Sequence, residues 1–269
     1  MTAAEIIPEG PFLSVLRADD DRYRVEQAER LASQDLLVKC AEQSVRAVHT
    51  AIASTLGRPG GMQRQRTRVA STLLLRAADD LDAFVMLALS GYPLQAATIG
   101  ASLWEKVQCI NLVVTSDDDA TKWLAGAIDL SADHPFWRTK TYRRGFDALA
   151  KTINAPVTYE DALLHYESLC RAKHAHPWIM EHYAIRRTDN EGTEFVYGPT
   201  GSSGWRLAVG EFAPIVLATL LWGVVGYANA NEDLLDERDR SLAEALAASF
   251  ELRVSLSAEI SREFRTTVK

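Results

Sequence analysis

The sequence predicts an all-α protein, a single bundle of seven or eight helices that carries one small β-hairpin near residues 183–197. Two observations support this prediction. Apolar residues recur at helical spacing through most of the chain, whereas convincing strand spacing occurs in one place. Strands and helices do not alternate, which argues against a parallel sheet covered by helices.

The composition is that of an ordinary globular domain. The chain has 269 residues, of which 47% are hydrophobic and 24% are charged. Because 29 basic residues oppose 36 acidic ones, the formal net charge is −7. This balance excludes a nucleic-acid binder that depends on overall positive charge. The three cysteines, Cys40, Cys109 and Cys170, lack zinc or disulfide spacing, so we expect a cytoplasmic protein without a metal or cofactor.

The first half of the chain predicts three long helices. After an irregular arm, a helix is expected over 21–55, and a Gly- and Pro-rich break follows it. Residues 1–60 are expected to pack as an arm and helix against a bundle domain, 61–269, or to form a dimer contact. Helices over 62–90 and 94–115 follow, and the second is apolar nearly all round, as is typical of the centre of a bundle.

The second half begins with two capped helices. Ser116 and Thr158 precede acidic residues and predict N-caps of helices over 116–130 and 158–175, with a basic helix over 136–153 between them. Turn residues at 189–192 then separate the two strands of the expected hairpin.

Residues 212–231 contain no charge and reach the length needed to span a bilayer. A core helix enclosed by other helices gives the same pattern. Pro214 and the lack of a flanking basic cluster favour the core helix, so we expect no membrane partner. A last amphipathic helix is expected over 232–264.

Histidines gather near the end of the helix expected over 158–175, where 165–182 hold four of the six in the chain. Helical spacing turns Arg171 toward solvent or a partner, and Pro177 places His176 at or just past the helix end. A histidine of near-neutral pKa can transfer a proton, and an arginine can stabilise charge on a phosphodiester. RNA supplies its own 2′-hydroxyl nucleophile, so such a site requires no metal.

The Arg171-x4-His176 spacing resembles the Arg-x4–6-His motif of HEPN ribonucleases, a superfamily that includes toxins and phage-defence effectors. This resemblance implies a metal-independent endoribonuclease in which Arg171 binds phosphate and His176, or His174, is the general acid and base. It also implies a homodimer with a shared site, RNA as the substrate, and an antitoxin or other protein as a partner.

A broader resemblance covers residues 62–230. The order of motifs is similar to that of bacterial helical proteins of unknown function, and it makes His174 the matched histidine. The residues that carry this resemblance are Leu103, Glu105, Trp123, Tyr166, Leu169, Cys170 and His174.

Glu105 is an unusual charge in an apolar helix and needs a partner from another helix. Arg171, His174 and Arg76 are the candidates. The carboxylate is either part of a buried ion pair that fixes packing or a pocket group with a shifted pKa.

Two further functions remain open beside the ribonuclease. The first is a small-molecule pocket inside the bundle, for which the candidate residues are Trp104, Glu105, Tyr166, Lys173 and His174. The second is a non-enzymatic module in which the long first and last helices mediate oligomerisation.

Local charge departs from the average of −7. Basic residues cluster over 58–76, 138–151 and 171–187, and they would attract phosphate if these stretches converged. If the stretches are scattered, they only aid solubility. The acidic residues Asp79, Asp80 and Asp82 are expected on a solvated helix face.

Overall fold

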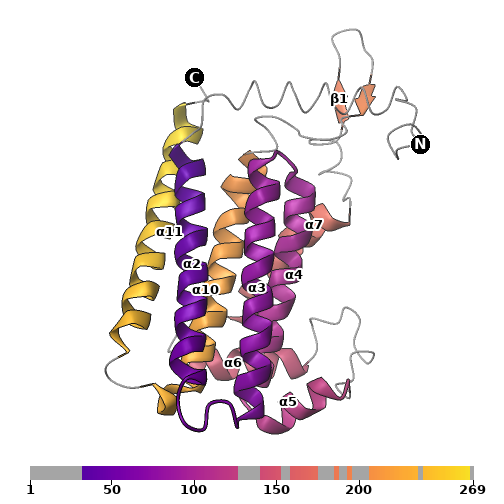
Figure 1. Ribbon diagram of the computed structural model, residues 1–269. Helices are drawn as coiled ribbons and strands as arrows, with labels where there is room; N and C mark the ends of the chain where they lie inside the picture. Colours follow the sequence, from indigo (N-terminus) through magenta and orange to yellow (C-terminus); the bar gives the residue numbers. More distant parts are fainter. Residues whose placement is uncertain are drawn as a thin grey trace, which may run out of the picture.

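The computed structural model describes residues 32–126, 140–152, 158–174, 185–187, 193–195, 206–235 and 239–266. Within these residues the chain is all-α, as the sequence predicts. Figure 1 shows the long helices standing side by side, with the short α5 and α6 near one end of the bundle. The α-helices are α2 (Ala32–Leu56), α3 (Gln65–Leu89), α4 (Pro93–Val113), α5 (Asp117–Leu124), α6 (Lys140–Thr152), α7 (Tyr159–Lys173), α10 (Ala213–Ala230) and α11 (Arg240–Thr266).

The apolar helix α10 lies at the centre and contacts α2, α3, α4 and α11. It follows directly on the π-helix η3 (Arg206–Phe212). Together they are long and apolar enough to cross a membrane, with a mean hydropathy of 1.9 over an 18-residue window that is 61% buried. Enclosure by four helices accounts for this apolar character, as the core-helix interpretation of 212–231 expects.

The two predicted caps are present. The side chain of Ser116 accepts a hydrogen bond from the backbone N–H of Asp119 at the start of α5. Thr158 and Asp161 form a reciprocal capping box at the start of α7. Both caps satisfy backbone N–H groups that a helix leaves unpaired at its first turn.

Two expected helix boundaries are wrong. The helix expected to run to 130 ends at Leu124, because Gly126 adopts a φ of 63°, a conformation that terminates helices. The helix expected from 232 begins at Arg240, since α10 ends at Ala230 with Asn231 as its C-cap, and the 3₁₀ turn η4 (Glu232–Leu234) intervenes. The Asn231 side chain donates to the Tyr227 carbonyl at 2.8 Å, which closes the last turn of α10.

Two three-residue strands, β1 (Ile185–Arg187) and β2 (Thr193–Phe195), pair antiparallel with Ile185 opposite Phe195. Both lie inside the range expected for the hairpin, whereas the expected turn at 189–192 lies outside the described residues. Six strand residues leave the fold class all-α.

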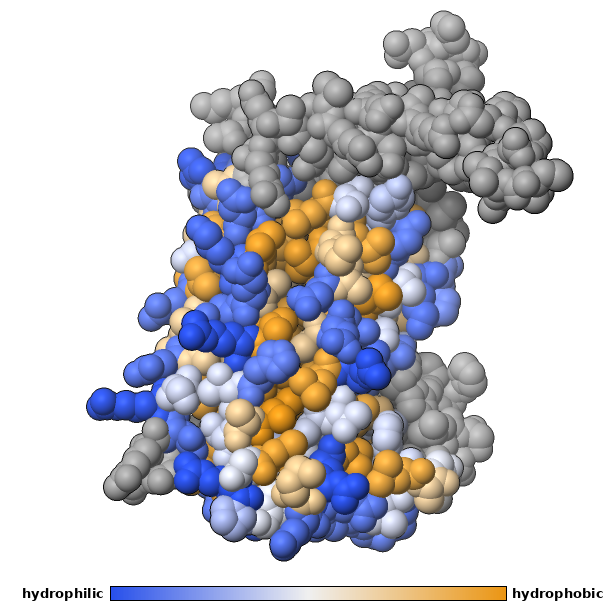
Figure 2. Space-filling model, viewed as in Figure 1, coloured by the Kyte–Doolittle hydropathy of each residue, from blue (hydrophilic) through white to orange (hydrophobic). Residues whose placement is uncertain are grey.

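Helix α2 packs against α3, α10 and α11 and contributes to the same hydrophobic core as the other long helices. Residues 1–31, with the expected arm and helix start, lie outside the described part. On the face where α2 and α3 lie, Figure 2 shows an apolar band bordered by hydrophilic residues.

A buried polar network joins α2, α3 and α10. The Tyr227 hydroxyl contacts the hydroxyl oxygens of Thr55 and of Ser71, the latter at 2.8 Å. Thr67 donates to Asn231 Oδ1 at 2.6 Å. Because buried polar groups need such partners, the network favours one register of these three helices.

Candidate functional site

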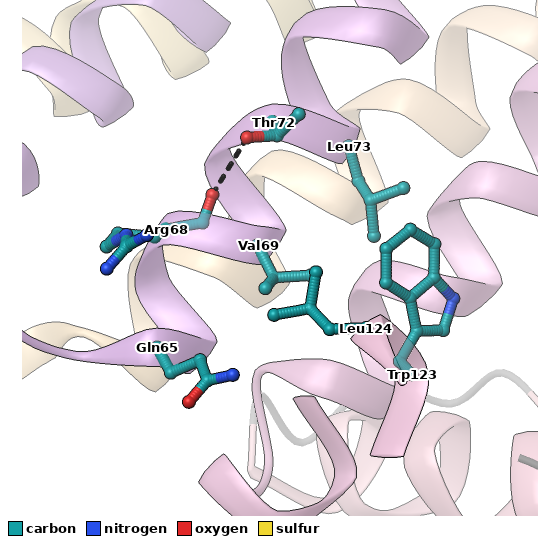
Figure 3. Close-up of a pocket in the computed structure, with 7 residues that line it drawn as sticks. All are labelled: Gln65, Arg68, Val69, Thr72, Leu73, Trp123 and Leu124. Atoms are coloured by element: carbon teal, nitrogen blue, oxygen red, sulfur yellow. Dashed lines mark hydrogen bonds between the residues drawn. The ribbon is translucent and has the colours of Figure 1, made fainter. Parts of the chain in front are cut away.

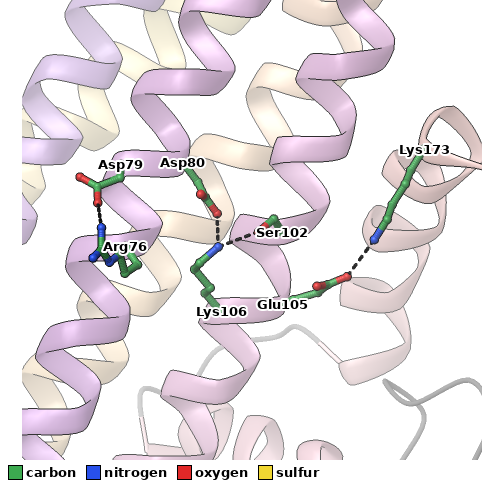
Figure 4. A network of polar contacts seen from close by, with 7 residues as sticks. All are labelled: Arg76, Asp79, Asp80, Ser102, Glu105, Lys106 and Lys173. Carbon is green, nitrogen blue, oxygen red and sulfur yellow. Dashed lines mark hydrogen bonds and ion pairs between the residues drawn. The ribbon is translucent and has the colours of Figure 1, made fainter.

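Four residues predicted for the site meet between α4 and α7, and we call them the Glu105 cluster. The Tyr166 hydroxyl donates to Glu105 Oε1 at 2.9 Å, and Lys173 Nζ lies 3.4 Å from the same oxygen. The rings of Trp104 and Tyr166 stack with centroids 4.4 Å apart. Figure 4 shows Glu105 and Lys173 facing each other from neighbouring helices.

The residues next to Glu105 point in different directions from α4. Trp104 is buried in the core. Lys106 reaches α3 instead, where Nζ donates to Asp80 Oδ2 at 2.5 Å and to Ser102 Oγ of its own helix at 2.6 Å (Figure 4). Asp80 is therefore partly buried and paired, which corrects the prediction that it lies on a solvated face. Its neighbours Asp79 and Asp82 are exposed, as expected.

The predicted partners of Glu105 are wrong. Arg76 binds Asp79 on its own helix at 3.1 Å, while Arg171 and His174 are exposed. The actual partners are seven residues apart on α7, a spacing that places Tyr166 and Lys173 on one face of a helix. That spacing could have indicated from the sequence that Tyr166 and Lys173 contact the same group.

Burial raises the pKa of Tyr166 well above its ordinary value, and hydrogen bonds with Cys170 and Glu105 raise it further. Tyr166 is thus a neutral hydrogen-bond donor at physiological pH. Burial also raises the pKa of the Cys170 thiol. A protonated thiol is a poor nucleophile, so the cluster is suited to binding and positioning rather than to covalent chemistry.

The candidate catalytic residues lie at the C-terminal end of α7. Arg171 is exposed, as its position on the helix predicts. His174 is the C-cap residue, exposed, and its backbone N–H donates to the Cys170 carbonyl at 2.8 Å. His176 lies outside the described residues.

Carboxylates compensate much of the local basic charge. Arg64 and Arg144 each contact a carboxylate at 2.7 Å or less, and these ion pairs join different elements. Such pairing lowers the attraction of these stretches for phosphate. The inter-element pairs are Arg58–Asp239, Arg64–Asp233, Arg143–Glu160 and Arg144–Asp119.

A cavity of about 150 Å³ borders Trp104, and we call it the Trp104 pocket. It lies among α4, α6, α7 and α10. Phe146 stacks on Trp222 in its wall, with centroids 4.9 Å apart and ring planes at 16°. The larger lining residues are Trp104, Gln108, Phe146, His165, Thr219 and Trp222.

Gln108 gives this pocket its polar character. Its side chain is 2% exposed, and its Oε1 accepts a hydrogen bond from Asn111 Nδ2 at 3.3 Å. Among the described residues this is the one hydrogen bond of the Gln108 side chain, and its Nε2 is not one of the fully buried atoms that lack a partner. The indole Nε1 of Trp222, in contrast, is a buried donor without a partner there. Buried donors are nearly always paired in folded proteins, so Trp222 Nε1 requires an explanation.

The sequence predicted a pocket at Trp104 but missed most of its wall. Glu105 and Tyr166 pack beside Trp104, and His174 lies at the exposed helix end. Gln108 follows Trp104 by four residues and therefore shares its helix face. As a neutral polar residue on an otherwise apolar helix, Gln108 could have been recognised in the sequence as a candidate for the pocket wall.

Another cavity, of about 340 Å³, lies between α3 and α5. Figure 3 shows Trp123 and Leu124 opposite Val69 and Leu73. Its polar lining residues lie at the surface, and the Thr72 hydroxyl donates to the Arg68 carbonyl at 3.0 Å. This cavity therefore lacks the buried, unpaired donor that distinguishes the Trp104 pocket.

All three cysteines are free thiols. Among the residues that the structure describes, no group of three or more His, Cys, Asp or Glu is arranged to hold a metal ion. Comparisons with models of protein families, with curated proteins and with solved structures found no match to this chain. The resemblance to HEPN ribonucleases stays a prediction.

Proposed function

We propose that this protein is a small-molecule-binding helical bundle whose ligand occupies the Trp104 pocket. The observation that carries the proposal lies in the wall of this cavity, where Trp222 Nε1 is a buried donor without a partner among the described residues. The nearly fully buried amide of Gln108 lines the same cavity, and its one hydrogen bond among the described residues is the one that Oε1 accepts from Asn111. An unpaired buried donor costs about 1–3 kcal/mol of stability. A ligand that accepts this hydrogen bond offsets the cost.

The Glu105 cluster supports the pocket from the side. Trp104 belongs to both, because its ring stacks on Tyr166 and lines the cavity. The hydrogen bond from Tyr166 to Glu105 ties α7 to α4. In this proposal the cluster fixes the position of α7, which forms one wall of the pocket through His165.

Thermal unfolding with a broad panel of metabolite-sized compounds tests the proposal. A ligand at 100 times its Kd stabilises the folded state by about 2.7 kcal/mol. For a chain of this size, Tm then rises by about 5 °C or more.

Two variants of α10 connect any shift to the pocket. Ala218→Leu places three more carbon atoms at the pocket wall and is expected to remove the shift. Ala228→Leu lies on the same helix outside the pocket and is expected to keep it. A panel in which no compound raises Tm, or a shift that persists in Ala218→Leu, would contradict the proposal.

An endoribonuclease is the second candidate function. It is supported by the exposure of Arg171 and His174 at the end of α7, where an RNA strand can reach both side chains. In this alternative Arg171 binds phosphate, and His176 or His174 transfers the proton.

RNA cleavage in the presence of EDTA tests this alternative. Arg171→Ala and His176→Ala are each expected to lower the rate at least about 100-fold. Arg68→Ala, at an exposed arginine of α3, is the matched control. A wild-type chain that cleaves no RNA, or variants that cleave at the wild-type rate, would exclude the ribonuclease.

The homodimer stays a prediction. Phe250 and Val254, one turn apart on α11, are exposed by 41% and 65%. They offer apolar surface on the last long helix, where the sequence predicts an oligomer contact. Sedimentation velocity across a concentration series tests it, and a monomer at every concentration would contradict it.

A further inference from the structure

We infer that the ligand of the Trp104 pocket is a flat, uncharged compound of about one ring that carries a hydrogen-bond acceptor, as an aromatic amide does. The inference rests on the proposed function and adds the chemical class of the ligand. Three properties of the pocket carry it: its size, its unpaired donors and its lack of charge.

The size and walls of the pocket select a single flat ring. Its volume of about 150 Å³ equals that of an engineered cavity known to hold benzene. Trp104 and the stacked pair of Phe146 and Trp222 supply aromatic surface in its wall. Aromatic rings favour stacked or edge contacts with other rings, whereas a puckered aliphatic ring cannot make the stacked contact.

The unpaired polar groups of the wall are donors. The Nε1 of Trp222 is a buried donor without a partner among the described residues. Asn111 Nδ2 donates to Gln108 Oε1 at 3.3 Å, and in this orientation Nε2 is the end of the Gln108 amide that has no partner among those residues. The Asn111 Oδ1 is buried and also lacks a partner there, but Asn111 does not line the pocket. Two donors require an acceptor, and a carbonyl oxygen with its two lone pairs is suited to that role.

The wall carries no permanent charge. Among its described lining residues His165 is the one titratable group, and it lies at the exposed side of α7. The nearest charges in the Glu105 cluster, on Glu105 and Lys173, are paired with each other. A charged compound would lose its hydration in the pocket without gaining an opposite charge, so an uncharged compound is favoured.

Four probes separate these properties. Benzamide is flat and neutral and carries a carbonyl acceptor. Toluene lacks the acceptor, cyclohexanecarboxamide lacks the flat ring, and benzoate carries a charge. Ligand-observed NMR and calorimetry on the full chain are expected to show benzamide binding about tenfold more tightly than each of the other three, the ratio set by one hydrogen bond to a buried donor.

A matched pair of variants on α4 tests the role of Gln108. Gln108→Met keeps the length of the side chain and removes the donor, so the preference for benzamide over toluene is expected to fall to about twofold or less. Gln95→Met, at an exposed position of the same helix, is expected to keep the tenfold preference. The comparison of probes uses the wild-type chain and stands even if Gln108→Met does not fold.

Failure of this inference differs from failure of the proposed function. If toluene, cyclohexanecarboxamide or benzoate binds as tightly as benzamide, and Ala218→Leu abolishes that binding, the pocket is a ligand site and the inferred class is wrong. If none of the four probes binds, the inferred class is also wrong. Thermal unfolding with the broad compound panel then tests whether the pocket binds any ligand. Benzamide binding that persists in Ala218→Leu places the ligand elsewhere and overturns both.

Discussion

Replacing Tyr166 by Phe removes one hydroxyl and keeps the ring that stacks on Trp104. The lost hydrogen bond runs to Glu105 Oε1 over 2.9 Å. Hydrogen bonds to charged groups contribute about 1.5–3 kcal/mol to stability. Since the Glu105 side chain is 25% exposed, water replaces part of the interaction. We therefore expect the free energy of unfolding to fall by about 1.5 kcal/mol, the lower end of that range.

A double-mutant cycle in urea unfolding measures this interaction directly. Glu105→Met is the second variant, because methionine has a similar length and accepts no comparable hydrogen bond. The expected coupling between the two positions is about 1 kcal/mol. Lys173→Met is the internal comparison and is expected to cost about 0.5 kcal/mol, because its 3.4 Å contact joins two partly exposed groups.

Two results would refute this reasoning. A coupling between Tyr166 and Glu105 below about 0.3 kcal/mol would show that the hydrogen bond does not join α4 to α7. A larger loss in Lys173→Met than in Tyr166→Phe would show that the ion pair, rather than the buried hydroxyl, dominates the cluster.

Three further predictions concern stability. Tyr227→Phe is expected to cost about 1 kcal/mol in urea unfolding, because the hydroxyls that it leaves on α2 and α3 also donate to carbonyls of their own helices; a loss above about 3 kcal/mol would contradict this. Gly145→Ala is expected to lower Tm, although alanine favours helices more than glycine does, since the new methyl group would lie 3.0 Å from the α4 backbone at Leu112. An unchanged Tm would show that α6 and α4 are not packed this closely. Burial raises the pKa of Cys40 to about 11 and the pKa of buried tyrosines above their ordinary value, so these groups ionise more readily in the unfolded chain. The contribution of these groups to the free energy of unfolding should therefore be fully present below about pH 8.5 and should be lost as the pH rises toward 11. A urea midpoint that stays constant over that range would contradict the raised pKa values.

Local sequence was sufficient for the fold class and for several element boundaries. Ser116 and Thr158 could be recognised as caps because capping depends on neighbours within three residues. The end of α5 also depends on a local feature, a glycine with positive φ just beyond the helix. The sequence predicts a longer helix because acidic and apolar residues continue after this glycine.

The site was less predictable because its contacts join distant segments. Trp104, Glu105, Tyr166 and Lys173 are in contact in the structure, and their role in binding a ligand stays a prediction. The partners expected for Glu105 from the sequence are not the side chains that it contacts. The missing partner of Trp222 Nε1 could not be predicted, since whether a polar group in a core has a partner depends on helices far away in sequence.

The central position of α10 has a consequence for synthesis of the chain. Helices α2, α3 and α4 are complete by Val113, yet the helix that fills the space between them begins at Ala213. About 100 residues must be translated in between, which takes roughly 5–20 s at ribosomal rates. During that interval the apolar faces of α2, α3 and α4 lack their common neighbour. The nascent chain thus presents chaperones with a long-lived apolar surface, and its decisive folding step comes near the end of translation.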